Sequence, residues 1–383
     1  MISGIIGSGA MGAGIAQVIA TAGHNVMLLD VNGEALERAG KNIKGSLDKL
    51  VAKGSITAEK ADEIFGNISL TQDYSSFCEC HLVIEAIVED LELKQNLFRE
   101  LNLFVTDTCV LASNTSSLSI TSIASICKHP ENFIGIHFFN PAAIMQLVEI
   151  IPAVQTKAGL AEEVKAWVSG WGKIPVIVKD TPGFIVNRIA RPFYGEAIRM
   201  MEEGIADCAT IDWAMTTIGG FKMGPFALMD FIGHDVNFRV TESVFSSFFF
   251  DQKYKPSFSQ KRLFEAGFFG KKSGRGFYNY SLPLPVATTD EVLGKQIVDR
   301  IVAMLINEAA EAMLMNVASI TDIELAMTKG VNYPMGLLKW ADEWGINKVL
   351  ESLDTLYNDY HEDRYRASVL LRRMSNTQNS FFN

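Results

Sequence analysis

The stretch GIIGSGAMGAGIAQ, residues 4–17, decides how the N-terminal part of the chain folds. A short apolar run leads into four closely spaced glycines, and an amphipathic segment follows them. The glycines are Gly7, Gly9, Gly12 and Gly14. A strand, a GxGxxG turn and a helix in this order are typical of a loop that holds a phosphate.

The glycine spacing and one downstream carboxylate indicate which cofactor the loop holds. Gly7 permits the turn, Gly9 lets the backbone approach a pyrophosphate, and Gly12 lets the helix pack close to the strand. The helix N-terminus then offers N–H groups to the anion. Asp30 ends the second predicted strand, where a carboxylate bonds both ribose hydroxyls of NAD and repels a 2′-phosphate. We therefore predict an NAD site, the alternative being a glycine turn with a surface aspartate.

Composition narrows the class of protein. The 383 residues are 48% hydrophobic and 20% charged, which predicts a soluble protein of two or three domains. A net charge of -10 without a basic block argues against nucleic-acid binding. No apolar run reaches about 18 residues, so we expect no membrane span. Since Met1 leads straight into the first strand, we also expect no signal peptide and a cytoplasmic location.

The five cysteines point to no special chemistry. Their spacing is irregular, and Cys78 and Cys80 lie too close together for the usual zinc or redox motifs. We therefore predict free thiols in a reducing compartment, and no metal site.

Roughly the first 180 residues alternate strand and helix patterns. Apolar runs predict strands at 4–6, 25–29, 82–85, 110–112, 133–136 and 175–178. Amphipathic segments predict intervening helices, among them 11–21, 33–51 and 91–104. This alternation favours a parallel sheet with helices on both faces, and hence a Rossmann-like NAD-binding domain over residues 1–182.

The strand patterns stop at the sequence DTPG, residues 180–183. Helices are then predicted at 185–201, 208–218 and 224–245, followed by a basic glycine-rich loop at 270–276 and a linker at 282–285. We expect a helical domain of the substrate-binding and dimerisation type over residues 183–281.

The segment after the linker repeats the one before it in a constant register, without a gap. Arg188 falls on Arg300, and Glu196 falls on Glu308. The sequence AMT at 214–216 falls on the same three letters at 326–328. One register held over this length indicates a duplication, with a second, structural helical domain at 290–383. The predicted fold class is thus an α/β Rossmann-like domain followed by two all-α domains related by internal duplication.

Polar residues after two buried strands are candidates for catalysis. Ser116 lies in SNTSSL, His137 follows the next strand, and Glu149 lies on a further apolar run. Oxidising an alcohol with NAD needs a base, a role that imidazole fills near neutral pH. We assign that role to His137, with Glu149 fixing its tautomer. Ser116 and Asn187 would hold the substrate oxygen. The other five histidines are not part of such a combination of candidate residues in the sequence.

Several motifs in one order resemble the L-3-hydroxyacyl-CoA dehydrogenases of fatty-acid and aromatic-acid degradation. They are GSGAMGAGIA, VIEAIVEDLELK, SNTSSL, HFFNPA, VEI, KDTPGFIVNR, GPFALMD and FGKKSGRGFY. The resemblance implies His137 and Glu149 as the catalytic pair, with Ser116 and Asn187 on the substrate. It implies cofactor contacts from Gly7, Gly9, Ala10, Met11, Gly12, Asp30, Glu89, Lys94, Asn114, Asn140 and Lys272. It also implies that Ser46 and Lys53 bind the CoA head group, although a solvated helix face explains those two equally well.

The expected function is NAD-dependent oxidation of an (S)-3-hydroxyacyl-CoA to a 3-oxoacyl-CoA. Two alternatives are a dehydrogenase of a free hydroxy acid or sugar acid, and a non-catalytic NAD-binding protein. The expected partner is the acyl-CoA substrate, with no nucleic acid and no membrane. Short members of the family dimerise through a single helical domain. The resemblance therefore implies either a monomer in which the two helical domains form a pseudo-dimer, or a homodimer.

Overall fold

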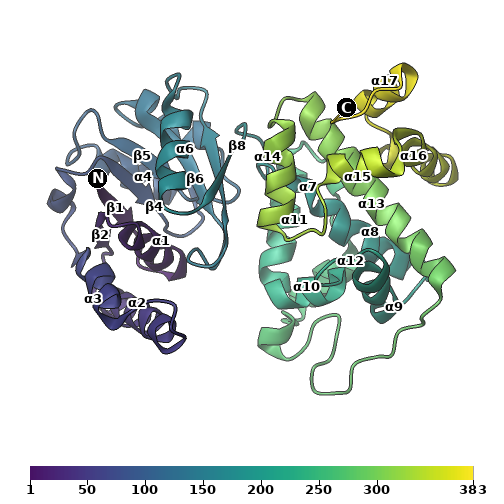
Figure 1. Ribbon diagram of the computed structural model, residues 1–383, viewed down its shortest axis with the longest axis horizontal. Coiled ribbons are helices and arrows are strands. Elements are labelled where there is room, and N and C mark those ends of the chain that lie inside the picture. The colour runs from purple at the N-terminus through teal and green to yellow at the C-terminus, as the bar shows by residue number, and fades with distance from the viewer. Residues whose placement is uncertain (383) are drawn as a thin grey trace. The chain divides into compact units, whose positions relative to one another are not determined.

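The chain forms two compact units in a computed structural model that describes residues 1–382 (Figure 1). The first unit is Met1–Thr181, and the second begins at Pro182. The first unit contains one sheet and its helices. The second unit is helical, with β-bridges at Gly270–Arg275 and Arg275–Asn279.

The sheet of the first unit has eight strands in the order β3-β2-β1-β4-β5-β6-β7-β8. The strands are β1 (Ile2–Ile6), β2 (Asn25–Leu29), β3 (Ile68–Thr71), β4 (Leu82–Glu85), β5 (Val110–Ser113), β6 (Phe133–Phe138), β7 (Leu147–Pro152) and β8 (Ile174–Ile177). The strand order reverses between β1 and β4. In an open α/β sheet, the ligand crevice lies beyond the carboxyl ends of the strands at such a reversal.

The prediction of a wholly parallel sheet is wrong at one place, because β6 and β7 run antiparallel. Only residues 139–146 connect them, whereas a parallel pair needs a crossover of a dozen or more residues. The antiparallel register places His137 directly opposite Glu149. Strand β7 was noted only as an apolar run that carries Glu149, and strand β3 was not predicted. Of its four residues only Ile68 is buried, so it lacks a strong apolar signal.

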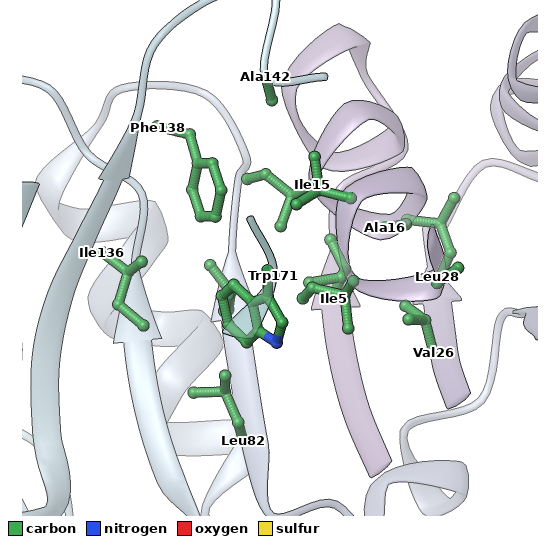
Figure 2. Close-up of a cluster of buried hydrophobic side chains, with 14 of the residues drawn as sticks. Ile5, Ile15, Ala16, Val26, Leu28, Leu82, Ile136, Phe138, Ala142 and Trp171 are labelled. Carbon is green, nitrogen blue, oxygen red and sulfur yellow. The ribbon is translucent and has the colours of Figure 1, made fainter. Parts of the chain in front are cut away.

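Helices pack against this sheet and enclose an apolar core. They are α1 (Ala10–Thr21), α2 (Gly33–Ala52), α3 (Ala58–Gly66), α4 (Leu91–Leu101), α5 (Ile120–Ala124) and α6 (Leu160–Gly170). Figure 2 shows Ile15 and Ala16 of α1 among Ile5, Val26 and Leu28 of the first two strands. This packing fixes the start of α1, and with it the glycine loop.

The helices of the second unit are α7 (Val186–Ile189), α8 (Arg191–Glu202), α9 (Cys208–Trp213), α10 (Pro225–Ile232), α11 (His234–Ser247), α12 (Phe258–Glu265), α13 (Glu291–Leu314), α14 (Ile320–Leu325), α15 (Leu337–Trp344), α16 (Ile346–Tyr360) and α17 (Val369–Thr377). Two of the three helices predicted in the second unit are interrupted, whereas 208–218 is helical throughout, as α9 and the π-helical turn Ala214–Ile218 that follows it. The predicted helix 185–201 breaks at Ala190, because Pro192 offers no N–H to the preceding turn. The predicted helix 224–245 breaks at Gly233, whose φ is 97°.

Elements of the second unit recur in the register that relates Arg188 to Arg300. In that register the first residue of α9 corresponds to that of α14, the first of α10 to that of α15, and the first of α11 to that of α16. A π-helical turn follows both α9 and α14, at Ala214–Ile218 and Ala326–Gly330. Helix α13 covers the positions that correspond to α7 and α8 without a break, and Met304 stands where Pro192 stands in the first set.

The helices of the second unit form two sets: the first set is α7 to α12, and the second set is α13 to α17. The two sets pack against each other through α8 and α13, which lie near each other in Figure 1. Arg188 Nε donates to Glu308 at 2.7 Å, and Arg300 Nε donates to Glu196 at 3.0 Å. All four side chains are buried. Because the two arginines occupy corresponding positions, and the two glutamates do as well, the contact is self-complementary, as in a twofold dimer.

Candidate active site

The glycine loop has the geometry that the sequence predicted. Gly7 has a φ of 100° and donates its N–H to Leu29 O at 2.8 Å. A Cβ on Gly12 would collide with Gly7 O, so the helix requires glycine there. A Cβ on Gly9 would meet nothing within 4 Å, and no side chain caps the start of α1 at Ala10 and Met11. Backbone N–H groups at this end of α1 are thus available to an anion.

A cavity of about 540 Å³ opens beside the loop. Its lining includes Gly9 and Ala10 of the loop, Asp30 after β2 and Ser46 on α2. Ser46, predicted to bind CoA, therefore borders the same space as the predicted dinucleotide residues. Lys53 does not line this cavity; it is exposed and follows the last residue of α2.

Asp30 is held in place by its neighbours. Its Oδ2 accepts both the N–H and the hydroxyl of Ser8 at 2.8 Å, and its Oδ1 accepts Asn32 N–H at 3.0 Å. Partial burial opposes ionisation, but these hydrogen bonds outweigh it and keep the pKa of Asp30 below its usual range. The carboxylate is therefore charged at neutral pH, as recognition of ribose hydroxyls requires. The part that Ser8 plays here was not predicted from the sequence.

His137 and Glu149 form a buried pair across β6 and β7. The Nδ1 of His137 lies 2.6 Å from Oε2 of Glu149, and both side chains are buried. A carboxylate accepts, so Nδ1 donates, and the neutral imidazole then has its lone pair on Nε2. The ring of Phe139 packs against the imidazole at a centroid distance of 4.6 Å. The arrangement suits a base that is held in one tautomer.

Glu89 organises the loop that carries Ser116. Its Oε1 accepts the N–H groups of Ser116 and Ser117 at 2.9 and 3.0 Å, and the Thr115 hydroxyl at 2.7 Å. Burial acts to raise the pKa of Glu89, but the charge of Lys94 and these donors outweigh it and lower the pKa. Glu89 is therefore a charged clamp on the candidate substrate loop.

Lys94 lies deeper than a direct cofactor contact would. It is 1% exposed, and its Nζ lies 2.5 Å from Glu85 and 3.5 Å from Glu89. Glu85 in turn accepts the hydroxyl of Ser113 at 2.6 Å. We therefore expect Lys94 to act on the cofactor through Glu89. Neither Glu85 nor Ser113 was predicted from the sequence to belong to the site.

Two asparagines lie near the candidate base. Asn114 accepts Phe138 N–H at 2.8 Å, which ties the end of β5 to the end of β6 beside His137. Asn140 follows β6, is exposed and precedes a cis peptide bond to Pro141. Pro141 lines the cavity beside the glycine loop.

Asn187 and Lys272 belong to the second unit. Asn187 is half-buried on α7, and its backbone carbonyl accepts Arg191 Nε at 2.8 Å. Lys272 pairs with Asp235 at 2.5 Å, a partner that the sequence analysis did not identify. Across residues 1–382, no group of three or more His, Cys, Asp or Glu side chains is arranged to hold a metal ion.

Two of the other histidines also have carboxylate partners, which were not predicted from the sequence. His234 Nε2 lies 2.8 Å from Asp230 Oδ1, and both residues are fully buried. Asp230 also accepts the N–H groups of Phe277 and Tyr278, so the pair fixes that chain segment. The spacing of four residues on a helical pattern could have revealed it. At the surface, His129 also pairs with a carboxylate, that of Glu131.

The chain matches one protein family along almost its whole length. The NAD-binding domain of 3-hydroxyacyl-CoA dehydrogenase matches residues 3–181, and the C-terminal domain of the same enzyme matches residues 183–280 and 297–380. The chain therefore belongs to the 3-hydroxyacyl-CoA dehydrogenase family, and its first unit is an NAD-binding domain of the Rossmann type. Membership makes it an NAD-dependent oxidoreductase.

Relatives support the same assignment. A 3-hydroxyadipyl-CoA dehydrogenase of Escherichia coli K12 is 38% identical and covers 96% of each chain. The mitochondrial hydroxyacyl-coenzyme A dehydrogenase of Homo sapiens is 42% identical over 72% of this chain and 90% of its own. The crystal structure of 3-hydroxybutyryl-CoA dehydrogenase from Escherichia coli K12 superposes with a TM-score of 0.95, at 36% identity and 98% coverage of both chains. No helix among residues 1–382 is long and apolar enough to cross a membrane.

Proposed function

We propose that this protein oxidises an (S)-3-hydroxyacyl-CoA to the 3-oxoacyl-CoA with NAD. The observation that carries the proposal is the buried His137–Glu149 pair, at 2.6 Å, in the same unit as the NAD loop. The relatives described above are named for 3-hydroxyadipyl-CoA, hydroxyacyl-coenzyme A and 3-hydroxybutyryl-CoA, which supports a hydroxyacyl-CoA substrate.

His137 is the base of the proposed reaction. Its Nε2 takes the proton of the 3-hydroxyl group while the hydride leaves C3, so that a C=O bond forms as the C–H and O–H bonds break. NAD, when bound, accepts that hydride. Glu149 keeps the imidazole in the required tautomer and stabilises the imidazolium that forms. Ser116 and Asn187 hold the substrate oxygen.

The residues of the loop and its surroundings suit NAD. Gly7, Gly9, Ala10, Met11 and Gly12 would hold the pyrophosphate, and Asp30 the adenosine ribose. Glu89, Asn114, Asn140 and Lys272 would contact the rest of the cofactor, with Lys94 behind Glu89. Ser46 and Lys53 would bind the CoA head group. The cavity beside Ser46 and the exposed charge of Lys53 at the end of α2 support this last assignment.

We also propose that residues 183–281 and 290–383 are duplicated domains that follow a domain at 1–182. Two matches to one C-terminal family domain support this, and so do the reciprocal ion pairs of Arg188 and Arg300. The chain end fits as well: Asp342 accepts Phe381 N–H at 2.9 Å, as Asp230 accepts Phe277 N–H. We infer a cytoplasmic monomer with an internal pseudo-dimer, a homodimer being the alternative.

An assay of NADH oxidation tests the reaction. Acetoacetyl-CoA should be reduced and free acetoacetate should not, whereas a free-acid dehydrogenase reduces the second and an NAD-binding scaffold reduces neither. His137→Ala should lower kcat at least about 100-fold, the lower range for acid–base catalysis. His24→Ala, in the same unit, is the matched control. NAD binding, measured by fluorescence titration, should survive both changes; normal turnover of His137→Ala would place the base elsewhere.

A further inference from the structure

The two sets of helices in the second unit differ at four corresponding interior positions. The first set has polar side chains there: Arg191, Asn237, Thr241 and Gln260. The second set has apolar ones: Ala303, Val349, Leu353 and Leu371, all 0% exposed. The first three pairs follow the register that relates Arg188 to Arg300. The fourth pair, Gln260 and Leu371, departs from that register by one position. The serines that cap α12 and α17, Ser257 and Ser368, depart from it by the same amount.

The four polar residues, here called the Arg191 cluster, are joined by hydrogen bonds. Gln260 Nε2 donates to Asn237 Oδ1 at 2.5 Å, and Thr241 Oγ1 donates to Asn237 O at 2.9 Å. Arg191 Nη1 donates to Thr241 Oγ1 at 3.0 Å. The cluster thus connects α8, α11 and α12 through the interior of the first set.

Arg191 carries a charge that the protein does not neutralise. Its side chain is 7% exposed and forms no ion pair with any residue from 1 to 382. Its other contacts are a backbone carbonyl and the ring of Tyr194, 4.9 Å from the guanidinium carbon. A buried charge without a counter-charge is destabilising, and the second set, with Ala303 at this position, shows that the fold does not need it.

A small cavity of about 30 Å³ lies beside Arg191. Its walls include Thr241, Lys253, Lys255 and Ser257, which supply cations and hydroxyl groups. Two further charged residues, Glu196 and Arg199, also line it; Glu196 is already paired with Arg300 at 3.0 Å and lies 3.5 Å from Arg199. A volume of this size exceeds the roughly 10–15 Å³ that one water needs, and suits a carboxylate group.

We propose that the Arg191 cavity binds a carboxylate. A guanidinium presents paired N–H groups that match the two oxygens of a carboxylate, and an anion there removes the unpaired buried charge. Two sources share this chemistry: a free carboxylate, or the far end of a dicarboxylic acyl chain on CoA. The second source rests on the proposed function. Arg191 lies four residues after Asn187 and donates to its carbonyl, and one relative is named for a dicarboxylic acyl-CoA.

Two substrates of equal chain length separate the acyl-chain source from the rest. 3-Hydroxyadipyl-CoA carries a terminal carboxylate, and 3-hydroxyhexanoyl-CoA ends in a methyl group. Wild-type kcat/KM should favour the first, and Arg191→Met should reduce that preference about 10- to 100-fold, the range for a charged hydrogen-bonded pair. Arg373→Met removes an exposed arginine from α17 and should leave the preference unchanged.

Thermal melting tests whether the cavity binds a free carboxylate. Adipate and acetate should raise the Tm of the wild-type protein and not of Arg191→Met, with neutral adipamide as the control ligand. If Arg191→Met does not fold, Arg191→Lys replaces it; this variant keeps the charge, loses the paired N–H geometry, and should show part of each effect.

The outcomes separate this inference from the reaction itself. Loss of the substrate preference in Arg191→Met assigns the site to the acyl chain, and loss of the Tm shift alone assigns it to a free carboxylate. If neither effect exists in the wild type, or both persist without Arg191, the carboxylate site is refuted. If neither acyl-CoA is oxidised, the proposed function fails, while the melting experiment still decides the site.

Discussion

The two sets of helices, residues 182–281 and 290–382, have the same order of elements but differ in what their interiors contain. The first set holds Asn187, a proline break and the Arg191 cluster. At the corresponding positions the second holds Asp299, an unbroken helix and apolar side chains. Where the first set pairs His234 with Asp230, the second has Ile346 in place of the histidine. Groups capable of chemistry are thus concentrated in one set.

What the two sets share is what holds them together. Both keep an arginine and a glutamate for the reciprocal buried pairs. Both also keep a carboxylate, Asp212 or Glu324, that accepts N–H groups at the start of the next helix. Packing residues thus persist in both sets, whereas the candidate site residues Asn187 and Lys272 lie in the first set, so changes in the two sets should separate stability from activity.

The largest expected effect comes from removing the second set. A chain that ends at Tyr280 uncovers Phe193 and Phe221, whose rings lie 5.7 and 5.0 Å from that of Tyr333. Exposed apolar patches of this kind drive association. We expect the truncated protein to dimerise or aggregate in size-exclusion chromatography with light scattering. A stable, active monomer with the Tm of the full chain would contradict the internal pseudo-dimer.

The next effect concerns the reciprocal ion pairs. Arg188→Met leaves Glu308 buried, and within residues 1–382 that carboxylate has no other cation at salt-bridge distance. Breaking a buried pair on one side costs about 3–5 kcal/mol of unfolding free energy. Arg300→Met should lower the unfolding free energy by less, because Glu196 keeps Arg199 at 3.5 Å and Arg364 at 3.8 Å.

Urea denaturation of the two variants measures the difference. The double variant Arg188→Met with Glu308→Gln should recover part of the loss, because it removes the unpaired charge. Equal losses of unfolding free energy in the two arginine variants would contradict the predicted difference. So would a loss below about 1 kcal/mol for Arg188→Met, which is the range of an exposed pair.

Much of the first unit follows from local sequence patterns. The predicted strands 25–29 and 82–85 agree with β2 and β4 residue for residue, because buried parallel strands are continuous apolar runs. The residues of β7 do not by themselves predict the direction of the strand, which follows from the short connection before it. In the second unit, periodicity predicted where helices lie but not that Gly233 would interrupt one.

The candidate site was predictable where a short motif carries it. The glycine loop and Asp30 have their expected geometry, and His137 lies beside Glu149 as proposed. The partners of these groups were not predictable. Ser8 on Asp30, and Glu85 on Lys94, depend on side chains that only the folded sheet brings together. A motif names the reactive group, whereas packing decides which neighbours set its charge and exposure.

A third prediction compares corresponding residues in the two sets. Asn187→Ala should lower kcat/KM for acetoacetyl-CoA about 10- to 100-fold, because the substrate oxygen loses a hydrogen bond. Asp299→Ala should leave kcat/KM unchanged, since Asp299 forms only a partly exposed pair with Lys348 at 3.7 Å. Steady-state kinetics at fixed NADH measures both. Equal losses in the two variants would show that the second set also serves catalysis.

The smallest expected effect is a pH dependence of stability. Burial raises the pKa of Asp212 to about 6, against the opposing hydrogen bonds from Tyr278 and the N–H groups of Phe226 and Ala227. A carboxyl group with a raised folded-state pKa binds protons more tightly in the folded protein, so stability rises as the pH falls through that value. Between pH 7 and pH 5 the gain from Asp212 should be about 1 kcal/mol of unfolding free energy. Asp212→Asn should remove this increment in urea denaturation series at the two pH values.

Burial also raises the pKa of Glu324, so Glu324→Gln should change the slope of unfolding free energy against pH in the same direction. A wild-type slope that neither variant alters would show that these half-buried carboxylates keep their charge throughout.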